Sequence, residues 1–416
     1  MKSNIALETE EARKSDDVLW SQRERQFRIA MVSYSFYDAD NRVMRYAETL
    51  AARGDHVDVI SLVRPGQSSR EIVRGVNVFR VQGRVINERG KWDYFWRVLS
   101  FFFRSIFLLT RNHLKDRYDL VHIHSVPDFM VFTALVPKLL GTKVILDIHD
   151  VLPEFYASKF RTSHSSVVFK TLLWIERVSA AFADHVIISN DIWLKKFTAR
   201  SASPGKCSTV LNFPDPDIFS RNGRTRNDSK FIILYPGTLS WHQGLDIAIR
   251  AFHLVRNELT NAEFHIYGTG AARDSLVQLI EELDLHDRVF IKKSLPLREI
   301  SKVIENADLG IVPKRKDPFG NEAFSTKTLE FMSLGVPLIV SDTAVDTYYF
   351  NNSVVAFFYD EDERDLARCM LMMGKHPEFR RELARNALEF VKDYSWDAKK
   401  GYYLSLVDSL AGDAGA

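Results

Sequence analysis

A polar segment in the C-terminal half of the chain has residue types and spacing suited to holding a phosphorylated ligand. Ser325 or Thr326 can cap the start of a helix that Gly335 ends. The free N–H groups and the positive dipole end at such a start suit a diphosphate. Lys327 stands in the first turn and can add a cation, while Glu330 follows on about the same face. We expect Glu330 to accept hydrogen bonds from two neighbouring hydroxyls of a ribose.

Glu322 precedes this helix in a loop, where it can meet the next group along the same ligand. A plainer interpretation stays open, in which Glu330 pairs only with Lys327 and Glu322 is a solvated loop residue. Two spaced glutamates alone do not decide between these interpretations.

Apolar runs that alternate with helical patterns predict the scaffold around this segment. In the N-terminal half, strands are expected at 27–33, 56–62, 120–124, 143–147 and 185–189, with helices over 43–53 and 130–140. A polar, turn-rich break follows at 212–228, and strands resume at 231–235, 263–267, 288–291, 309–312 and 338–340. The expected fold class is α/β, with two tandem doubly wound Rossmann-like domains facing a cleft, because ligands bind beyond the carboxyl ends of such strands.

Composition excludes several other classes of protein. The chain has 416 residues and a net charge of +2, so its charge does not favour a nucleic-acid partner. Its 2 cysteines exclude a disulfide framework and a four-cysteine zinc site. Residues 1–26 lack an apolar signal region and are expected to form a mobile polar tail, and no uncharged stretch is long enough to span a membrane. We expect a cytoplasmic protein.

One aromatic segment, residues 92–115, carries arginines at a fixed interval. Arg97, Arg104 and Arg111 recur with heptad spacing, so they share one face of a helix. An aromatic helix with such a basic stripe can lie in an anionic membrane surface, which would place the protein peripherally at the inner face of the membrane. The alternative is a core helix whose arginines face water.

The segment that follows Glu322 resembles the Glu-x7-Glu motif of retaining glycosyltransferases of family four, which have the GT-B fold. Glu322 and Glu330 have the motif's spacing, and Phe324 falls at its usual phenylalanine. Ser325 stands where glycine is usual, and residues 329–337 are also close to the family pattern.

Further segments of the chain resemble the same family and occur in the order in which the family has them. They resemble the start of the family's donor domain, its next strand with a glycine turn, the His-Asp segment beside its reaction centre, and its closing helix. The glycine turn at Gly268 and Gly270 lacks the third glycine of a dinucleotide fingerprint, so an NAD site is rejected. The matching segments are 235–239, 244–252, 264–270, 147–154 and 394–410.

The resemblance implies a domain organisation and a role for each site residue. It divides the chain into an acceptor-binding Rossmann-like domain at 27–211, a linker at 212–229, a nucleotide-sugar-binding domain at 230–395 and a C-terminal helix at 396–416 that crosses back to the first domain. The expected catalytic residues are His149, Asp150, Glu322 and Lys327. The expected donor-binding residues are Gly237, Thr238, Gly268, Gly270, Lys314, Arg315, Phe324, Ser325, Thr326 and Glu330.

His149 is expected to orient the sugar or the acceptor, with Asp150 in support; alternatively, it is a core histidine satisfied by Asp150. Arg42 stands near the family's usual glycine pair, where it can contact an anionic acceptor or be an exposed arginine. The family's usual diphosphate-binding arginine and lysine fall near Thr238 and Gln243, so both cations are missing. Lys327 must then contribute more to binding the diphosphate, together with Lys314 or Arg315. Whether the loss of the two usual cations reduces the activity stays open.

No metal or other cofactor is expected. Asp38-Ala39-Asp40 and Asp215-Pro216-Asp217 imitate a metal-binding Asp-x-Asp of another glycosyltransferase fold, but both lie in loops and are interpreted as turn chemistry. His122 and His124 alternate along a strand, and we expect them to face opposite sides, which argues against a zinc pair.

The resemblance implies transfer of a sugar from a nucleotide diphosphate sugar to an acceptor hydroxyl, with retention of configuration. The aromatic helix favours a lipid-linked or other glycan acceptor in surface polysaccharide synthesis. Two alternatives stay open: a non-catalytic GT-B subunit that binds a nucleotide sugar or a partner enzyme, and a nucleotide-sugar epimerase. The sequence does not identify the sugar, the base, the acceptor, the linkage or the oligomeric state.

Overall fold

The computed structural model describes residues 25–83, 91–160, 162–163 and 165–413. Almost all of the tail predicted at 1–26 lies outside these residues. The chain forms two compact units: unit 1 comprises residues 1–153, 164–211 and 399–416, and unit 2 comprises 154–163 and 212–398. The predicted linker at 212–229 falls in unit 2, and residues 154–163 also join unit 2, although the sequence suggested the first domain for them.

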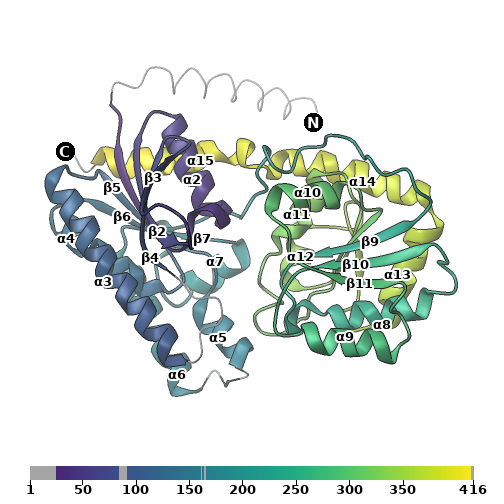
Figure 1. The fold of residues 1–416 in the computed structure, drawn as a ribbon. Helices are drawn as coiled ribbons and strands as arrows, with labels where there is room; N and C mark the ends of the chain where they lie inside the picture. The colour runs from purple at the N-terminus through teal and green to yellow at the C-terminus, as the bar shows by residue number, and fades with distance from the viewer. Residues whose placement is uncertain (1–24, 84–90, 161, 164, 414–416) are drawn as a thin grey trace. The chain divides into compact units, whose positions relative to one another are not determined.

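Unit 1 is built on an eight-stranded sheet with the order β3-β4-β2-β1-β5-β6-β7-β8 (Figure 1). The pairs are parallel except β3 with β4. The chain runs outward from β1 through β2 to the edge strand β3, turns back into β4, and then crosses to β5 on the other side of β1, so the sheet has a topological switch point between β1 and β5. The strands are β1 (Arg28–Phe36), β2 (His56–Val63), β3 (Arg70–Val73), β4 (Val76–Gly83), β5 (Leu120–His124), β6 (Lys143–Ile148), β7 (His185–Ile188) and β8 (Cys207–Thr209).

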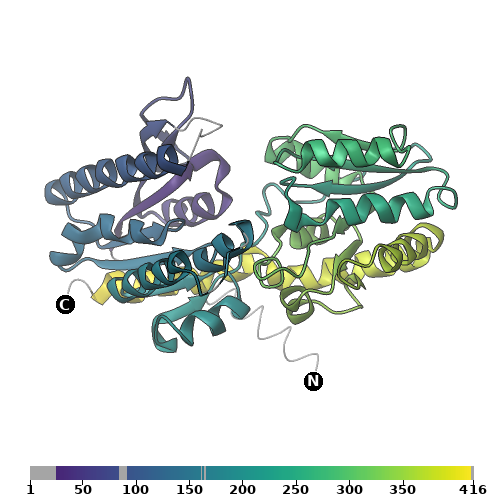
Figure 2. The ribbon, with the colours of Figure 1, turned by 90° about the horizontal axis from the view of Figure 1, so that it is seen from below.

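Helices cover both faces of this sheet, with α3 and α15 on opposite sides (Figure 2). Local sequence explains the helix nearest the switch point: the side chain of Asp40 caps α2 by accepting from the N–H of Val43, and α2 ends before Gly54, whose φ is 99°. The helices are α2 (Asn41–Ala52), α3 (Lys91–Lys115), α4 (Leu135–Leu139), α5 (Leu152–Phe160), α6 (Val167–Phe182), α7 (Asp191–Thr198) and α15 (Trp396–Asp413). Helix α5 and the first residues of α15 extend into unit 2.

Unit 2 contains a six-stranded sheet with the order β11-β10-β9-β12-β13-β14, in which every pair is parallel. The strands are β9 (Phe231–Pro236), β10 (Ala262–Tyr267), β11 (Val289–Lys292), β12 (Leu309–Val312), β13 (Leu338–Ser341) and β14 (Ala356–Phe358). The helices are α8 (Leu245–Val255), α9 (Arg273–Glu282), α10 (Leu297–Glu305), α11 (Thr326–Ser333), α12 (Ala344–Tyr349), α13 (Glu363–Lys375) and α14 (Pro377–Val391). Here the switch point lies between β9 and β12.

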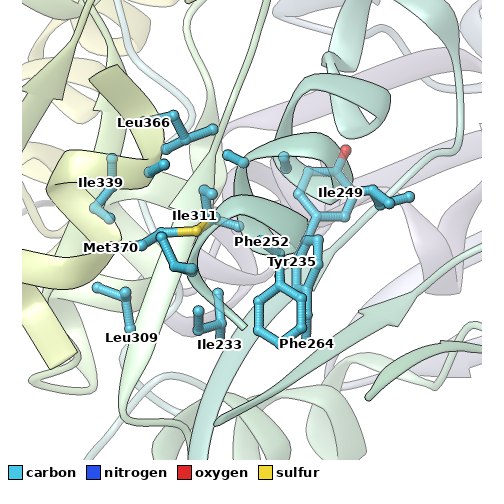
Figure 3. Close-up of a cluster of buried hydrophobic side chains, with 14 of the residues drawn as sticks. Ile233, Tyr235, Ile249, Phe252, Phe264, Leu309, Ile311, Ile339, Leu366 and Met370 are labelled. Carbon is cyan, nitrogen blue, oxygen red and sulfur yellow. The ribbon is translucent and has the colours of Figure 1, made fainter. Parts of the chain in front are cut away.

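The core of unit 2 joins its sheet to α8 and α13 (Figure 3). Ile233 and Phe264 from the strands, Phe252 from α8 and Met370 from α13 are all fully buried. Such continuous apolar strands are typical of a parallel sheet covered on both faces. The expected α/β class with two doubly wound Rossmann-like domains is confirmed, while a cleft between them stays a prediction.

No described helix is long and apolar enough to cross a membrane.

Candidate functional site

The switch point of unit 2 gathers most of the predicted donor-binding residues. Gly237 and Thr238 follow β9, and Lys314 and Arg315 follow β12, its neighbour in the sheet. In open α/β sheets, ligands bind beyond the carboxyl ends of the strands at such a point. The sheet therefore brings segments distant in sequence to the edge where a ligand is expected.

The predicted glycines at this edge are required by the packing of two loops. A Cβ on Gly268 would clash with the carbonyl oxygen of Gly237, and a Cβ on Gly270 would clash with the carbonyl oxygen of Leu239. Backbone hydrogen bonds from Gly237 N to Tyr267 O (2.8 Å) and from Leu239 N to Thr269 O (2.9 Å) join the loops. The glycines thus shape the edge, and a direct contact with a ligand stays a prediction.

Helix α11 presents its N-terminus with open hydrogen-bonding capacity. Ser325 occupies the N-cap position, but its hydroxyl makes no capping hydrogen bond. Within the described part of the chain, the buried Oγ of Ser325 and Oγ1 of Thr328 have no hydrogen-bond partner. Unpaired buried hydroxyls are costly, so the arrangement is suited to an anion that would satisfy Ser325 and the free N–H groups.

Lys327 reaches from α11 to the end of β9. A Cβ on Gly237 would collide with Cε of Lys327, and the Lys327 ammonium lies 5.4 Å from the ring centroid of Tyr235. Burial lowers the pKa of Lys327, and the positive charge of Lys314 lowers it further, while the negative charge of Glu330 acts in the opposite direction. An ammonium that has lost part of its hydration gains more from a bound anion than one in open water.

Lys314 and Arg315 have internal partners. Lys314 Nζ lies 2.9 Å from Asp346 Oδ2 and donates to the carbonyl oxygen of Ala323 at 2.6 Å. Arg315 forms a two-point ion pair with Asp246, at 3.0 and 2.7 Å, and a second pair with Glu361 at 2.7 Å. These cations stabilise the loops around the edge, and a direct contact with a diphosphate stays a prediction for both.

The two motif glutamates are partly exposed on either side of the start of α11. The backbone N–H of Glu322 donates to Phe319 O at 3.1 Å, and Phe324 packs edge-on against Tyr349 with centroids 5.1 Å apart. The effect of Glu330 on Lys327 fits the plainer interpretation that they interact, and it leaves ribose binding untested. Thr326 is the first residue of α11 and is partly exposed.

Unit 1 gathers a different group of side chains at its own switch point. His149 follows β6, and its Nε2 lies 3.1 Å from Asp147 Oδ2 and 3.3 Å from His124 Nδ1. His124 Nδ1 is also 3.1 Å from the same carboxylate oxygen. Arg42 donates to both oxygens of Asp147, at 2.8 and 2.7 Å, and to Val210 O at 2.7 Å.

The expectation that His122 and His124 face opposite sides of their strand is wrong. Their ring centroids are 4.2 Å apart on the same face of β5. Side chains alternate with a period of two, so residues i and i+2 share a face. Together with Asp147 they place three potential ligand atoms within 4.8 Å of one another. Because Arg42 occupies both oxygens of that carboxylate with a positive charge, we assign no metal to this group.

The partners of Arg42 and His149 differ from those expected. Arg42 is 3% exposed, which excludes the exposed alternative, and its donors face Asp147 and Val210. A contact between Arg42 and an acceptor therefore has no support in this geometry. His149 is bonded to Asp147, whereas burial raises the pKa of Asp150 against the opposing charge of His149. Asp147 and His124 were not among the site residues predicted from the sequence, although the i, i+2 spacing of Asp147 and His149 indicates that their side chains share a face.

The two Asp-x-Asp segments serve the local backbone. Asp40 caps α2, and Asp38 pairs with Arg64. In the second segment, Asp215 Oδ1 accepts from the N–H of Asp217 at 2.9 Å. These contacts agree with their interpretation as turn chemistry.

Helix α3 places large apolar side chains in solvent. Trp96, Phe103, Phe107 and Leu114 are 61–68% exposed, and their spacing aligns them along one stripe of the helix. Arg104 and Arg111 flank the stripe and are exposed, while Val98, Phe101 and Leu109 are buried on the opposite side. The alternative of an ordinary core helix therefore explains its inner face but not this outer stripe.

Two family models match the chain in tandem. Residues 39–212 match the model described as glycosyl transferase 4-like domain, and residues 217–390 match the model described as glycosyl transferases group 1. The two matches meet close to the junction at residue 212 where unit 2 resumes.

Relatives and solved structures agree with these matches. An uncharacterised glycosyltransferase of Methanocaldococcus jannaschii is 25% identical over 367 residues, covering 84% of this chain and 89% of that protein. GDP-mannose:cellobiosyl-diphosphopolyprenol alpha-mannosyltransferase of Xanthomonas oryzae is 23% identical, covering 69% and 73%. Sucrose-phosphate synthase of Thermosynechococcus elongatus superposes with a TM-score of 0.76 at 19% identity, covering 94% and 100%. HepE of Anabaena, solved with UDP and glucose, gives 0.70 at 14%, covering 92% and 100%.

Proposed function

We propose that this chain, whose two domains belong to glycosyltransferase families, transfers a sugar from a nucleotide diphosphate sugar to an acceptor hydroxyl with retention of configuration. The chain is a glycosyltransferase of the GT-B fold. The donor, the acceptor and the stereochemical course are the proposed part. Unit 2 binds the donor and unit 1 the acceptor.

The observation that carries the donor assignment is the arrangement at the start of α11. Lys327 reaches the end of β9, and the buried hydroxyl of Ser325 lacks a hydrogen-bond partner among the described residues. A diphosphate bound there would satisfy the hydroxyl and the helix N–H groups and would meet the ammonium. Glu330, one turn along, would accept from the ribose hydroxyls, and Glu322 would contact the sugar.

Catalysis at this site would consist chiefly of charge stabilisation. As the bond from the sugar to the diphosphate breaks, negative charge grows on the leaving phosphate, where Lys327 and the α11 N–H groups can stabilise it. No covalent nucleophile is assigned, and the departing phosphate helps to deprotonate the acceptor. His149 orients the sugar or acceptor hydroxyl near the reacting carbon. No metal ion or other cofactor is proposed for these steps.

We further propose that the exposed stripe on α3 rests on the inner face of an anionic membrane. The apolar side chains would enter the interface while Arg104 and Arg111 meet acidic headgroups. A protein so placed would meet a lipid-linked acceptor, the class of acceptor that the Xanthomonas relative is named for. The proposal of a lipid-linked acceptor therefore depends on the exposed apolar stripe of α3 in unit 1.

A thermal-shift panel tests the donor site. UDP, GDP, ADP and their sugars are added to the wild-type chain, to Glu330→Ala and to the control Glu281→Ala, whose carboxylate is exposed on α9. We expect one nucleotide sugar to raise the midpoint of the wild type and the control but not of Glu330→Ala. No shift from any donor would contradict the site and favour a non-catalytic subunit. Release of free nucleotide diphosphate only when acceptor is present would exclude an epimerase.

A further inference from the structure

His149 is held by a buried carboxylate two positions earlier in the sequence. Its Nε2 lies 3.1 Å from Asp147 Oδ2. Its backbone is fixed as well, because the hydroxyl of Ser189, after β7, donates to the carbonyl oxygen of His149 at 2.7 Å. Both the ring and the main chain of His149 are therefore fixed by unit 1 before any ligand binds.

Asp147 is itself locked in one orientation. It is fully buried, and Arg42 donates to both of its oxygens. Burial alone would raise the pKa of Asp147, but the charge of Arg42, followed by His149 and the hydrogen bonds from the two histidines, holds it well below its usual range. Asp147 thus remains ionised at neutral pH, and an ionised carboxylate can only accept hydrogen bonds.

This decides which nitrogen of His149 carries the proton. A neutral imidazole has one N–H, and only an N–H can bond to a carboxylate. The contact of His149 Nε2 with the carboxylate (3.1 Å) is shorter than its contact with His124 Nδ1 (3.3 Å), and both histidines can donate to Asp147, so Nε2 is assigned as the donor and Nδ1 as the acceptor. His149 is also the most exposed of the three histidines near the carboxylate: its side chain is 22% exposed, while those of His122 and His124 are 0% exposed.

We propose that Asp147 is a positioning residue that keeps the proton of neutral His149 on Nε2 and leaves Nδ1 to accept a hydrogen bond from a sugar or acceptor hydroxyl. The ligand in this statement rests on the proposed function, whereas the tautomer rests on the geometry of unit 1 alone. Asp150, which the sequence suggested as the support of His149, is not the residue that sets the tautomer.

The electrostatic surroundings of His149 come from several elements. Asp40 and Arg42 belong to the start of α2, His124 lies on β5, and Asp150 follows β6. Asp147 is the anion in direct hydrogen-bond contact, and Arg42 is the cation behind it. The substitution Asp147→Asn should therefore remove the constraint on the His149 ring, because Arg42 can donate to the amide oxygen and the amide NH2 can then donate to Nε2.

The test measures the tautomer of His149 directly. The full chain is labelled with 15N-histidine, and long-range 1H–15N spectra are recorded from pH 5 to pH 8, with His149 assigned by the signal lost in His149→Asn. We expect the Nε2–H tautomer in the wild type. Asp147→Asn should move the proton of neutral His149 toward Nδ1, because the amide NH2 of Asn can donate to Nε2. Asp150→Asn, the matched control, should keep the Nε2–H tautomer.

Asp147→Asn leaves Arg42 buried without its anion, so this variant can fail to fold. The double variant Arg42→Gln/Asp147→Asn removes both charges and should still move the proton of His149 toward Nδ1, because the carboxylate that accepts from Nε2 is lost. An Nδ1–H tautomer in the wild type overturns the proposal, as does an unchanged Nε2–H tautomer in a folded Asp147 variant. These spectra need no donor or acceptor, so their outcome is separate from the failure of the proposed transfer reaction.

Discussion

The switch points of the two units are built on opposite principles. In unit 1, Arg42 and two histidines surround the carboxylate of the buried Asp147, while the buried Nε2 atoms of His122 and His124 have no hydrogen-bond partner among the described residues. In unit 2, the start of α11 keeps the buried hydroxyl of Ser325 without a partner among the described residues, and Lys327 stays partly exposed. The buried charge of the first edge is compensated by the protein itself, whereas the second edge is suited to completion by an anionic ligand.

The difference indicates how each edge should respond to change. Substitutions in a charge-compensated buried cluster expose uncompensated charge and should reduce stability. Substitutions at an edge completed by a ligand should spare the fold and reduce binding or catalysis. Four predictions test this contrast, in order of decreasing effect.

Arg42→Met should cause the largest loss of stability. It leaves Asp147 buried and charged without its cation, which typically costs about 3–5 kcal/mol. Urea unfolding followed by tryptophan fluorescence measures the change at pH 7. The control Arg111→Met, at an exposed position on α3, should change the unfolding free energy by less than about 0.5 kcal/mol. Equal stability of the two variants would contradict a charge-compensated cluster in unit 1.

Lys327→Gln should leave the fold intact and reduce transfer about 100-fold, because one preorganised charge on the leaving phosphate is lost. Initial rates of nucleotide diphosphate release, measured with the donor found in the thermal-shift panel, give the effect. The matched control Lys293→Gln, at an exposed position after β11, should keep its activity. If Lys327→Gln were as active as this control, the role assigned to α11 would be wrong.

His122→Asn should weaken the dependence of stability on acid. Burial lowers the pKa of His122 well below its usual value, so below about pH 6.5 the unfolded chain binds a proton that the folded chain does not. Stability should therefore fall as pH decreases, by about 1.4 kcal/mol per pH unit for this group. Unfolding at several values between pH 5 and pH 8 should show that His122→Asn loses this part of the slope. His286→Asn, at an exposed position, should keep it.

Phe107→Ala should give the smallest effect, a roughly fivefold loss of partitioning to anionic vesicles, since only part of its apolar surface would enter the interface. Flotation with phosphatidylglycerol vesicles at low and high salt measures it. Tyr359→Ala, which removes an aromatic side chain 68% exposed in unit 2, should bind like the wild type. Binding that is absent, or insensitive to salt, would refute the membrane surface on α3.

Most of the fold could be predicted, because strands of parallel sheets are continuous apolar runs. The runs at 231–235 and 309–312 lie within β9 and β12. Strands β3, β4, β8 and β14 were not predicted, since β3 is exposed, β4 alternates buried with half-buried residues, and β8 and β14 are only three residues long. The outward stripe on α3 was missed because the arginines, and not the aromatics, were taken to define the helix face.

Within the candidate site, local patterns predicted some features and not others. The start of α11 was predicted from Ser325 and Gly335, since capping and termination are decided by neighbours in sequence. The partners of Lys314 could not be predicted, because Asp346 is brought to it by the return of the chain through β13. The packing role of Gly268 could not be predicted either, since the carbonyl oxygen that leaves no room for a side chain there belongs to Gly237, which follows a different strand.

The sequence by itself determined the alternation of strands and helices, the restart of the pattern after residue 212, and a helix N-terminus with Lys327 and Glu330 on one face. These features depend on residues within a few turns of one another. Only the tertiary structure decided that Arg42 belongs to Asp147, that Asp147 holds His149, and that Lys327 lies against Gly237. Each of these contacts joins segments that meet because parallel strands align their carboxyl ends, and hydrophobic burial of whole strands, not the polar residues themselves, sets that alignment.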